Sequence, residues 1–319
     1  MKKFFAVWLF VFIVFGSISA QTTKFRRSDL FSTLSYPSLN KYSVSDVYQH
    51  KMSKLKVPVY DPFYQKINYK ILAGIGAVYL GTGIGVNIYQ HNAWWSSDRT
   101  SFHIQNDWVY ALWLDKVGHF YAATLLAHAF SAGLEAGNIS LEQSAIYGSV
   151  LGMAFQLYVE VEDGFGAQWG FSPGDAYSDV LGSGYALAQY YYPFLKNFQF
   201  KFSYYPSLKM REGLHKGIAI DDYEGQKYWL SMKMKNLLPQ SIAEYWPSFL
   251  DLAVGMGVEN LNGRGGGQQE FYIALDFDAE SIPLYGKGWQ FIKNTLNYFH
   301  FPMPGIRITP NAAFFVLCF

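Results

Sequence analysis

The chain has 319 residues, a formal net charge of +1, 50% hydrophobic and 19% aromatic residues, and only 15% charged residues. This balance argues against nucleic-acid binding, because there is no basic excess to neutralise phosphates. A chain so poor in charge and so rich in aromatic rings is typical of a protein that contacts a membrane. The only cysteine is Cys318, so an intrachain disulfide is excluded.

The N-terminus has the pattern of a bacterial secretory signal peptide. Lys2 and Lys3 precede an apolar run over residues 4–15, and small residues lead up to Gln21. We expect cleavage after Ala20. An uncleaved anchor is the alternative, but the run is shorter than the roughly 20 residues that span a membrane. No cysteine follows the small residues, so the signal is not of the lipoprotein kind.

Residues 21–66 are polar and interrupted by proline, which predicts an irregular arm. The next segment, residues 71–89, carries no charged side chain and predicts a helix. In it, Gly81 and Gly85 form a small-xxx-small pair, which allows a close helix partner. Two interpretations stay open: a helix embedded in or lying against a membrane, and a buried helix of a large soluble core.

Three further helices are predicted, over residues 108–136, 141–161 and 173–191. Ser140 and Gln143 form a capping box at the start of the second of these, and Pro193 ends the third. The paired Trp94 and Trp95 precede all three. Such a pair is typical of a membrane headgroup interface, although packing within a loop explains it equally well.

After Pro193 the sequence alternates with a period of two, which is typical of β-strands. We expect strands over residues 198–204, 230–235, 250–259, 270–278, 306–309 and 312–319. Apolar side chains occupy one face and polar side chains the other. Both an outer-membrane barrel and a soluble sheet with one face on a core explain this. The alternation that ends in Phe319 favours the barrel, whereas the strand number falls short of the usual eight.

Ionisable residues stand at helical spacing in each of the last three predicted helices. Each pair shares one helix face, and the pairs are Asp115 and His119, Glu160 and Asp163, and Asp175 and Asp179. Lys116 follows Asp115 and can pair with an acid of another helix. Because the helices are expected to run antiparallel, all three pairs are predicted to meet at one end of the bundle. Burying such charges is costly unless they find one another.

Three interpretations of this cluster stay open. The first is a structural network of buried ion pairs that holds the helices in register. The second is a metal or lipid-headgroup site, for which the candidate binding residues are Lys116, Glu160, Asp163, Asp175 and Asp179. The third is acid–base catalysis, for which the candidate catalytic residues are His119 and, as its orienting group, Asp115. The sequence identifies no cofactor.

These residues carry a resemblance. The ordered set is Asp115-Lys116-x-x-His119-Phe120, Glu160-x-x-Asp163 and Phe171-Ser172-x-x-Asp175-x-x-x-Asp179-x-x-Gly182. It resembles the YfiM-like group of predicted periplasmic or envelope proteins of unknown function, and more distantly the VanZ-like membrane family. The VanZ-like pattern has Asn at the position of Asp179 and an Arg before the Phe-Ser element, where this chain has Gln168-Trp169-Gly170. The resemblance covers residues 108–191 and implies a compact helical module at the cell envelope, with no established reaction.

Together these features predict an α+β fold, with an N-terminal four-helix membrane-apposed bundle followed by a C-terminal antiparallel β-sheet or partial barrel. The predicted parts are a signal peptide (1–20), an arm (21–66), a helical domain (67–197) and a β-rich domain (198–319). We expect an exported, non-enzymatic cell-envelope protein, associated with the outer rather than the inner membrane. Its expected partner is membrane lipid or another envelope protein. The alternative is a membrane-associated enzyme, or a metal- or lipid-headgroup-binding protein, that uses His119 and the surrounding acids.

Overall fold

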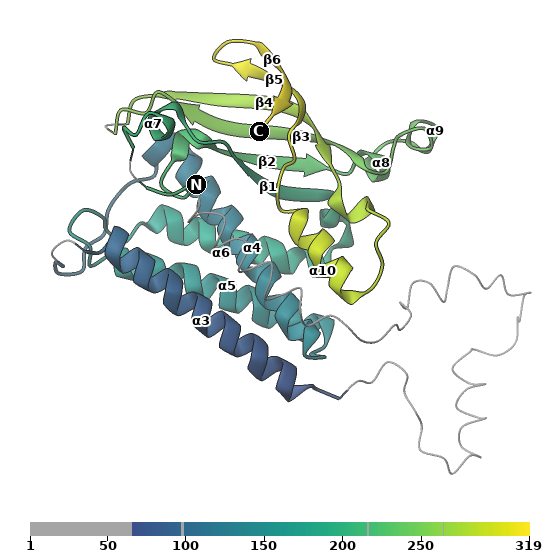
Figure 1. Cartoon of the computed structure of the whole chain (residues 1–319), viewed down its shortest axis with the longest axis horizontal. Coiled ribbons are helices and arrows are strands. Elements are labelled where there is room, and N and C mark those ends of the chain that lie inside the picture. Colours follow the sequence, from purple (N-terminus) through teal and green to yellow (C-terminus); the bar gives the residue numbers. More distant parts are fainter. Residues whose placement is uncertain (1–65, 97–98, 216, 264) are drawn as a thin grey trace, which may run out of the picture.

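The computed structural model describes residues 66–96, 99–215, 217–263 and 265–319. The predicted signal peptide and all but the last residue of the predicted arm lie outside these ranges. The described chain has long helices in its first part and a six-stranded antiparallel sheet in its second part. Figure 1 shows the two parts as layers, with the sheet above the helices. The predicted α+β class is confirmed.

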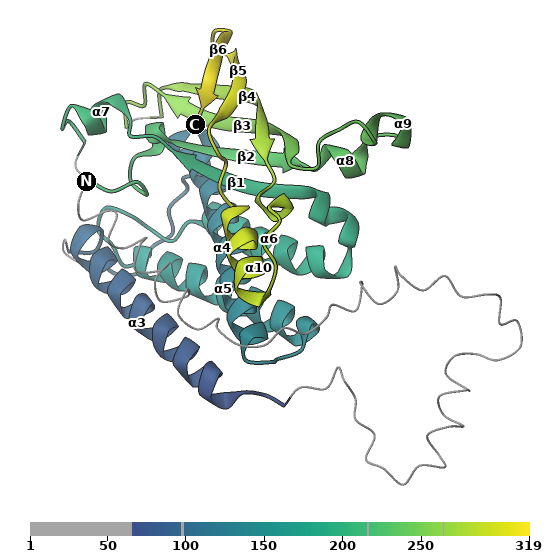
Figure 2. The same ribbon diagram turned by 45° about the vertical axis from the view of Figure 1, so that its right-hand side comes forward.

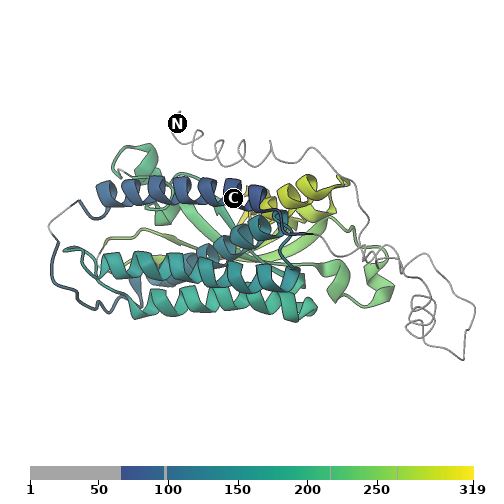
Figure 3. The same ribbon diagram turned by 90° about the horizontal axis from the view of Figure 1, so that it is seen from below.

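Four long helices form the helical layer: α3 (Tyr69–Ala93), α4 (Leu114–Ala136), α5 (Leu141–Asp163) and α6 (Pro173–Tyr191). Seen from below, α3 runs along the outside of this layer (Figure 3). The helix starts follow from their caps. Ser140 Oγ accepts a hydrogen bond from the backbone N–H of Gln143, and Ser172 Oγ accepts one from that of Asp175. Pro173 occupies the first turn of α6, where its missing N–H costs nothing.

The helix predicted from residue 108 begins later, at Leu114, because the backbone turns left-handed just before it. Ala111, Leu112 and Trp113 have φ of 45°, 55° and 75°, within the short η1 (Tyr110–Trp113). This conformation costs an L-residue roughly 1–2 kcal/mol. Ala111 and Leu114 are buried together with Val258 of the sheet. Packing between the layers therefore holds the turn, which local sequence does not favour.

Glycines set how closely the helices approach. A Cβ on Gly152 of α5 would lie 2.8 Å from the backbone nitrogen of Ala127 in α4. A Cβ on Gly182 of α6 would overlap the carbonyl oxygen of Phe120 in α4. Because these residues are small, the backbones of α5 and α6 lie against α4. The distances between polar side chains on the three helices are therefore short.

The outer helix α3 differs from the others, because only Ile75 and Gln90 of its residues are buried. The interpretation of this segment as the buried helix of a soluble core was therefore wrong. A Cβ on Gly81 or Gly85 would meet no described atom within 4 Å, so their expected close partner is not among the described residues. Tyr79 fastens α3 to the layer by donating its hydroxyl to the carbonyl of Ala129, at 2.5 Å.

The paired tryptophans after α3 join their loop to other parts of the chain. Trp95 is 3% exposed, and its indole N–H donates to Asp163 Oδ1 at 2.6 Å. The indole N–H of Trp94 donates to Asp221 Oδ1 at 2.8 Å. Loop packing accounts for both rings, and the alternative of a headgroup position is unnecessary for Trp95.

The sheet is a meander in which each strand pairs with its sequence neighbours. Its strands are β1 (Phe198–Tyr204), β2 (Gln226–Met232), β3 (Leu250–Glu259), β4 (Gln268–Phe277), β5 (Met303–Thr309) and β6 (Ala313–Cys318). All six lie within or overlap the segments predicted from alternation. The second was expected over residues 230–235 but spans Gln226–Met232, and Met234 and Lys235 lie in the short helix α8 (Met234–Leu237). Alternation alone does not fix where a strand starts or ends.

Short elements join these strands and helices. They are η2 (Pro193–Asn197), α7 (Leu208–Arg211), η3 (Tyr223–Gly225), α8 (Met234–Leu237), α9 (Gln240–Ala243), η4 (Ala279–Ser281) and α10 (Lys287–Leu296). None of these short elements was predicted, and α10 is the longest of them. It fills the space between the sheet and the end of α4 (Figure 2), where Phe291 and Thr295 contact His128.

One face of the sheet is apolar across all six strands. The paired residues that cross it are Phe200, Leu230, Val254, Ile273, Ile306 and Phe314. We call this set the outer row. α4 covers the start of the row, where Phe120 packs on Phe200 with ring centroids 4.6 Å apart. Beyond that cover the row is open, and Ile306 is 49% and Phe314 67% exposed.

The opposite face is buried and largely polar, because the sheet curls on itself. Phe202 of β1 forms a parallel bridge with Phe299, just before β5, which brings the first strand close to the fifth. Inside the curl, the ammonium of Lys201 lies 2.6 Å from Asp276 Oδ2, and His300 Nδ1 lies 2.9 Å from Asp276 Oδ1. A small apolar cluster around Trp229 and Tyr272 fills the remainder.

The close approach of α6 to α4 predicts that Gly182→Ala is destabilising, by about 2 kcal/mol or more, because the added methyl meets backbone that has no room to move. Thermal and urea unfolding measure the effect. Gly184→Ala is the matched control on the same helix. It meets nothing within 4 Å and should stabilise by up to about 1 kcal/mol, as a helix-interior Gly→Ala change does. Equal effects of the two changes would contradict the packing described above.

Candidate functional site

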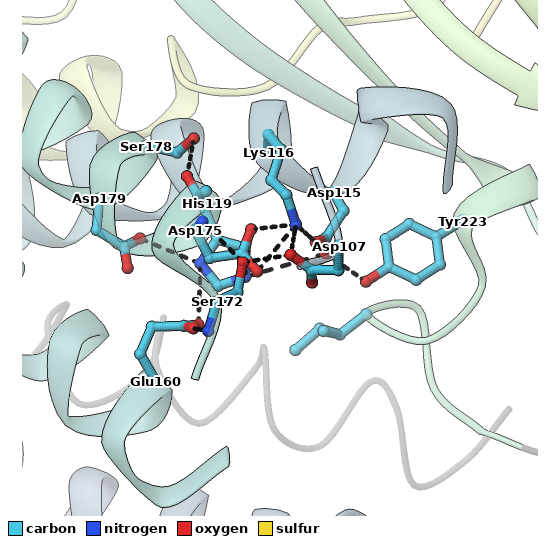
Figure 4. Close-up of polar contacts among 12 residues, drawn as sticks. Asp107, Asp115, Lys116, His119, Glu160, Ser172, Asp175, Ser178, Asp179 and Tyr223 are labelled. Atoms are coloured by element: carbon cyan, nitrogen blue, oxygen red, sulfur yellow. Dashed lines mark hydrogen bonds and ion pairs between the residues drawn. The ribbon is translucent and has the colours of Figure 1, made fainter. Parts of the chain in front are cut away.

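The predicted polar residues, apart from Asp163, come from three helices and point toward one another (Figure 4). Asp115, Lys116 and His119 lie at the start of α4, and Glu160 lies near the end of α5. Asp175 and Asp179 lie in the first half of α6. Since α4 and α5 run antiparallel and a loop joins α5 to α6, these helix ends are neighbours in space.

Lys116 forms one half of the site, which we call the lysine half. Its ammonium lies 2.8 Å from Asp115 Oδ2, 2.8 Å from Asp175 Oδ1 and 3.0 Å from Asp107 Oδ1. The lysine side chain is only 6% exposed. Three carboxylates, from a loop and two helices, therefore share one buried cation. Tyr223 adds a fourth tie by donating its hydroxyl to Asp115 Oδ1 at 2.6 Å.

His119 forms the other half, which we call the histidine half. Its Nδ1 lies 3.1 Å from Asp179 Oδ1 and 3.7 Å from Glu160 Oε1. Its Nε2 faces the lysine half, 3.7 Å from Asp175 Oδ1 and 3.9 Å from Asp115 Oδ1. The expected partner of His119 within its own helix was Asp115. The closest carboxylate is instead that of Asp179, from α6.

Neighbouring groups hold the two acids of the histidine half in place. Glu160 is 1% exposed, and its Oε2 accepts the backbone N–H of Ser172 at 3.2 Å. Asp179 is fully buried, and its Oδ1 also accepts from the amide of Gln156 at 3.2 Å. The second oxygen, Asp179 Oδ2, is buried without a hydrogen-bond partner among the described residues.

Asp163 does not join this group. Its carboxylate accepts the indole N–H of Trp95, so it fixes the loop after α3. Burial raises the pKa of Asp163 to about 6. His128, nine residues along α4 from His119, packs against Tyr298 and Thr295, and burial lowers its pKa to about 4. This is the behaviour of a core histidine.

Sequence reasoning missed Asp107, Gln156 and Tyr223. Asp107 and Tyr223 lie outside the four long helices, in segments with no periodic pattern that would place them. Gln156 stands four residues before Glu160 on α5, so the i, i+4 spacing was available as a signal for it. A search for uncharged amides as well as ionisable groups would have found that residue.

The pKa values of the site are shifted because it is buried and contains more acidic than basic side chains. Burial first, and then neighbouring carboxylates, raise the pKa of Glu160 to about 9 and that of Asp175 to about 7. Burial also raises the pKa of Asp179. For Asp115 burial acts in the same direction, but His119 and Lys116 outweigh it and lower the pKa.

The pKa of His119 is also raised, but by charge and not by burial. Burial alone would lower its pKa, yet the hydrogen bond to Asp179 and the charges of Asp115 and Asp175 raise it well above the ordinary value. The arrangement has three chemical capacities. It can hold the helices together by ion pairs, exchange protons between His119 and a carboxylate, or bind a cation through His119 and the acids.

Removing the shared cation should destabilise the fold. Lys116→Met keeps an unbranched side chain but leaves three acids facing one another. We expect a loss of about 3–5 kcal/mol of unfolding free energy, as for other buried pairs that lose one partner. Arg99→Gln is the control, because it breaks an ion pair to Glu162 with a 47% exposed arginine and should cost under about 1 kcal/mol. Similar urea midpoints for the two variants would contradict the role of Lys116.

The raised pKa of Glu160 predicts a pH-dependent stability in chelator-treated protein. Between the unfolded pKa near 4.5 and the folded pKa of about 9, the folded state keeps a proton that the unfolded state releases. Stability should therefore fall as pH rises from 5 to 9, by up to about 1.4 kcal/mol per unit. Glu160→Gln should flatten this slope in urea unfolding, and Glu162→Gln should keep it. An unchanged slope in Glu160→Gln would refute the assignment.

In the comparison with known proteins, one family model matches part of the chain. A family model described as "Predicted periplasmic lipoprotein (DUF2279)" matches residues 105–191. No curated protein and no solved structure matches the chain. The matched segment contains α4, α5 and α6, and with them both halves of the site apart from Tyr223. The match fits an exported protein of the cell envelope, and it covers about the same part of the chain as the YfiM-like resemblance.

Proposed function

We propose that the chain is a non-enzymatic cell-envelope protein that is held against the outer membrane by its apolar outer surface. One observation carries this proposal. The described residues bury more polar than apolar side chains, while long apolar side chains remain exposed on α3, α5, α6 and the sheet. Soluble proteins rarely leave large contiguous apolar patches open, so such surfaces mark contacts with lipid or partner proteins.

The sheet supports the proposal most directly. Its outer row is apolar on every strand, and its curled interior holds the charged group of Lys201, Asp276 and His300. Apolar-out and polar-in alternation is the pattern of sheets that face lipid. A groove of about 190 Å³ between Val117 of α4 and the outer row adds apolar volume beside that surface.

The helix α3 gives a second, separate surface. It is the single described helix that is long and apolar enough to cross a membrane, and 6% of its most apolar window is buried. Exposed side chains on it include Leu80, Ile84 and Ile88. Because Cys318 is the only cysteine and is buried in the sheet, we propose that these side chains, and no attached lipid at that thiol, make the membrane contact.

Charges placed on the outer row test this proposal. The double change Ile273→Lys and Ile306→Lys should lower the fraction of protein that sediments with outer membranes at least tenfold, since lysine is expelled from lipid at a cost of roughly 1–4 kcal/mol each, depending on depth. Separated inner and outer membranes, washed at high salt, give the readout. Gln268→Lys adds the same charge at an exposed polar position of β4 and should leave sedimentation unchanged.

Three results would contradict the proposal. They are wild-type protein that stays in the soluble periplasmic fraction, wild-type protein that sediments with the inner membrane, and a double variant that sediments like Gln268→Lys.

A second candidate function is a membrane-associated enzyme or a lipid-headgroup-binding protein that uses the polar site. The close approach of Asp179 to His119, at 3.1 Å, favours it, because a carboxylate that orients an imidazole is the usual arrangement for acid–base work. In that case Asp179, and not Asp115, is the orienting group. His119→Gln would then abolish turnover or binding in a folded protein, whereas a purely structural site predicts only lost stability.

A further inference from the structure

We propose that His119, Glu160 and Asp179 form a binding site for one first-row divalent metal ion, of which Zn²⁺ and Mn²⁺ are the representatives to test. The proposal goes beyond membrane association, because these three side chains lie inside the helical layer and away from the outer row. Each residue offers one ligand atom, and the three atoms lie within 4.8 Å of one another.

The choice between the two halves of the site follows from Lys116. A second group, Asp115, His119 and Asp175, has similar spacing. In that group the ammonium of Lys116 already lies 2.8 Å from each of the two carboxylates. A dication there would face a fixed positive charge at close range. In the histidine half no ion pair among the described residues brings a lysine or arginine to Glu160 or Asp179, so no fixed positive charge of that kind opposes a cation there.

The distances suit a metal ion. A tetrahedral ion with ligands about 2.0–2.1 Å away separates neighbouring ligand atoms by about 3.3 Å. His119 Nδ1 lies 3.1 Å from Asp179 Oδ1 and 3.7 Å from Glu160 Oε1. These values stand on either side of the ideal one, so small side-chain rotations bring the three donors onto one ion.

One oxygen of the Asp179 carboxylate is buried without a partner within the described ranges. Asp179 is fully buried and its Oδ2 has no hydrogen-bond partner in the described part of the chain. Leaving a carboxylate oxygen in that condition is costly, and a metal ion would remove the cost. The side chain of His119 is 20% exposed, so part of it reaches solvent.

The surrounding groups match those that usually support metal ligands. Ligating histidines generally direct their second ring nitrogen at a carboxylate, and ligating carboxylates are themselves hydrogen-bonded. Here Nε2 of His119 faces Asp115 and Asp175, which Lys116 holds in place. Gln156 and the backbone of Ser172 hold the carboxylates of Asp179 and Glu160. One imidazole with two carboxylates favours Zn²⁺ or Mn²⁺ over softer ions that prefer thiolates.

Calorimetric titration of the full-length, chelator-treated protein with Zn²⁺ and with Mn²⁺ tests the site. We expect one ion per chain for the wild type. Glu160→Gln and Asp179→Asn should weaken binding about 100-fold or more, since each removes a ligand charge. Glu162→Gln is the matched control: it stands two residues away on the same helix, in an exposed ion pair with Arg99, and should bind like the wild type.

A nitrogen-detected spectrum of the imidazole gives a second readout that a purely structural role would not change. Added Zn²⁺ should shift the Nδ1 resonance of His119 in wild type and Glu162→Gln. If Asp179→Asn does not fold, Glu160→Gln decides, because a glutamine oxygen still accepts the N–H of Ser172. The proposal is overturned by folded wild-type protein that takes up neither ion, or by uptake that both ligand variants retain. Either result would leave sedimentation with outer membranes unchanged.

Discussion

The structure depends on one buried ammonium that three carboxylates share. Lys116 reaches Asp107 in a loop, Asp115 on its own helix and Asp175 at the start of α6. Without the lysine, the three carboxylates would repel one another. We propose that the network specifies the axial position of α6 against α4, with packing at Gly182 bringing the helices near and the charges selecting one register.

The same principle operates in the sheet layer, where Lys201 and His300 meet Asp276 inside the curl. In both layers the polar groups are inside and the long apolar side chains are largely outside. A soluble fold buries its apolar face to gain stability from water. Here much of that face stays open, which supports the proposed contact with lipid or a partner. The buried ion pairs then hold together a structure that has comparatively little apolar core.

Much of this was readable from the sequence, and the misses have physical causes. Helical spacing placed Asp115, His119, Asp175 and Asp179 on inward faces because the period of a helix fixes which residues share a face. Asp163 obeyed the same spacing, yet it stands at the last residue of α5, where the loop and Trp95 capture it. Asp107 and Tyr223 lie in segments without a periodic sequence pattern, so their positions could not be predicted. Only the tertiary fold brings the loop with Asp107 and the segment before β2 to Lys116.

The left-handed turn before α4 could not be predicted either, because its residues are held by contacts with Val258, far along the chain. Alternation located each strand but left open which face is buried. Alternation along a strand assigns side chains to two faces but does not show which face is buried. The sheet curls so that Phe202 forms a bridge with Phe299, and this curl places the polar face inside. A strand list without pairing does not contain that information.

The two halves of the polar site tie different elements together. The lysine half joins α4, α6 and the loop at Asp107, and through Tyr223 it reaches the segment that leads into β2. The helix α5 takes part through Glu160 and Gln156, both in the histidine half. A cation bound by His119, Glu160 and Asp179 would thus tighten α5 against a frame that Lys116 has already fixed. Loss of that cation would loosen α5 selectively and leave the frame and its contact with the sheet in place, which separates a bound ion from a general stabiliser of the fold.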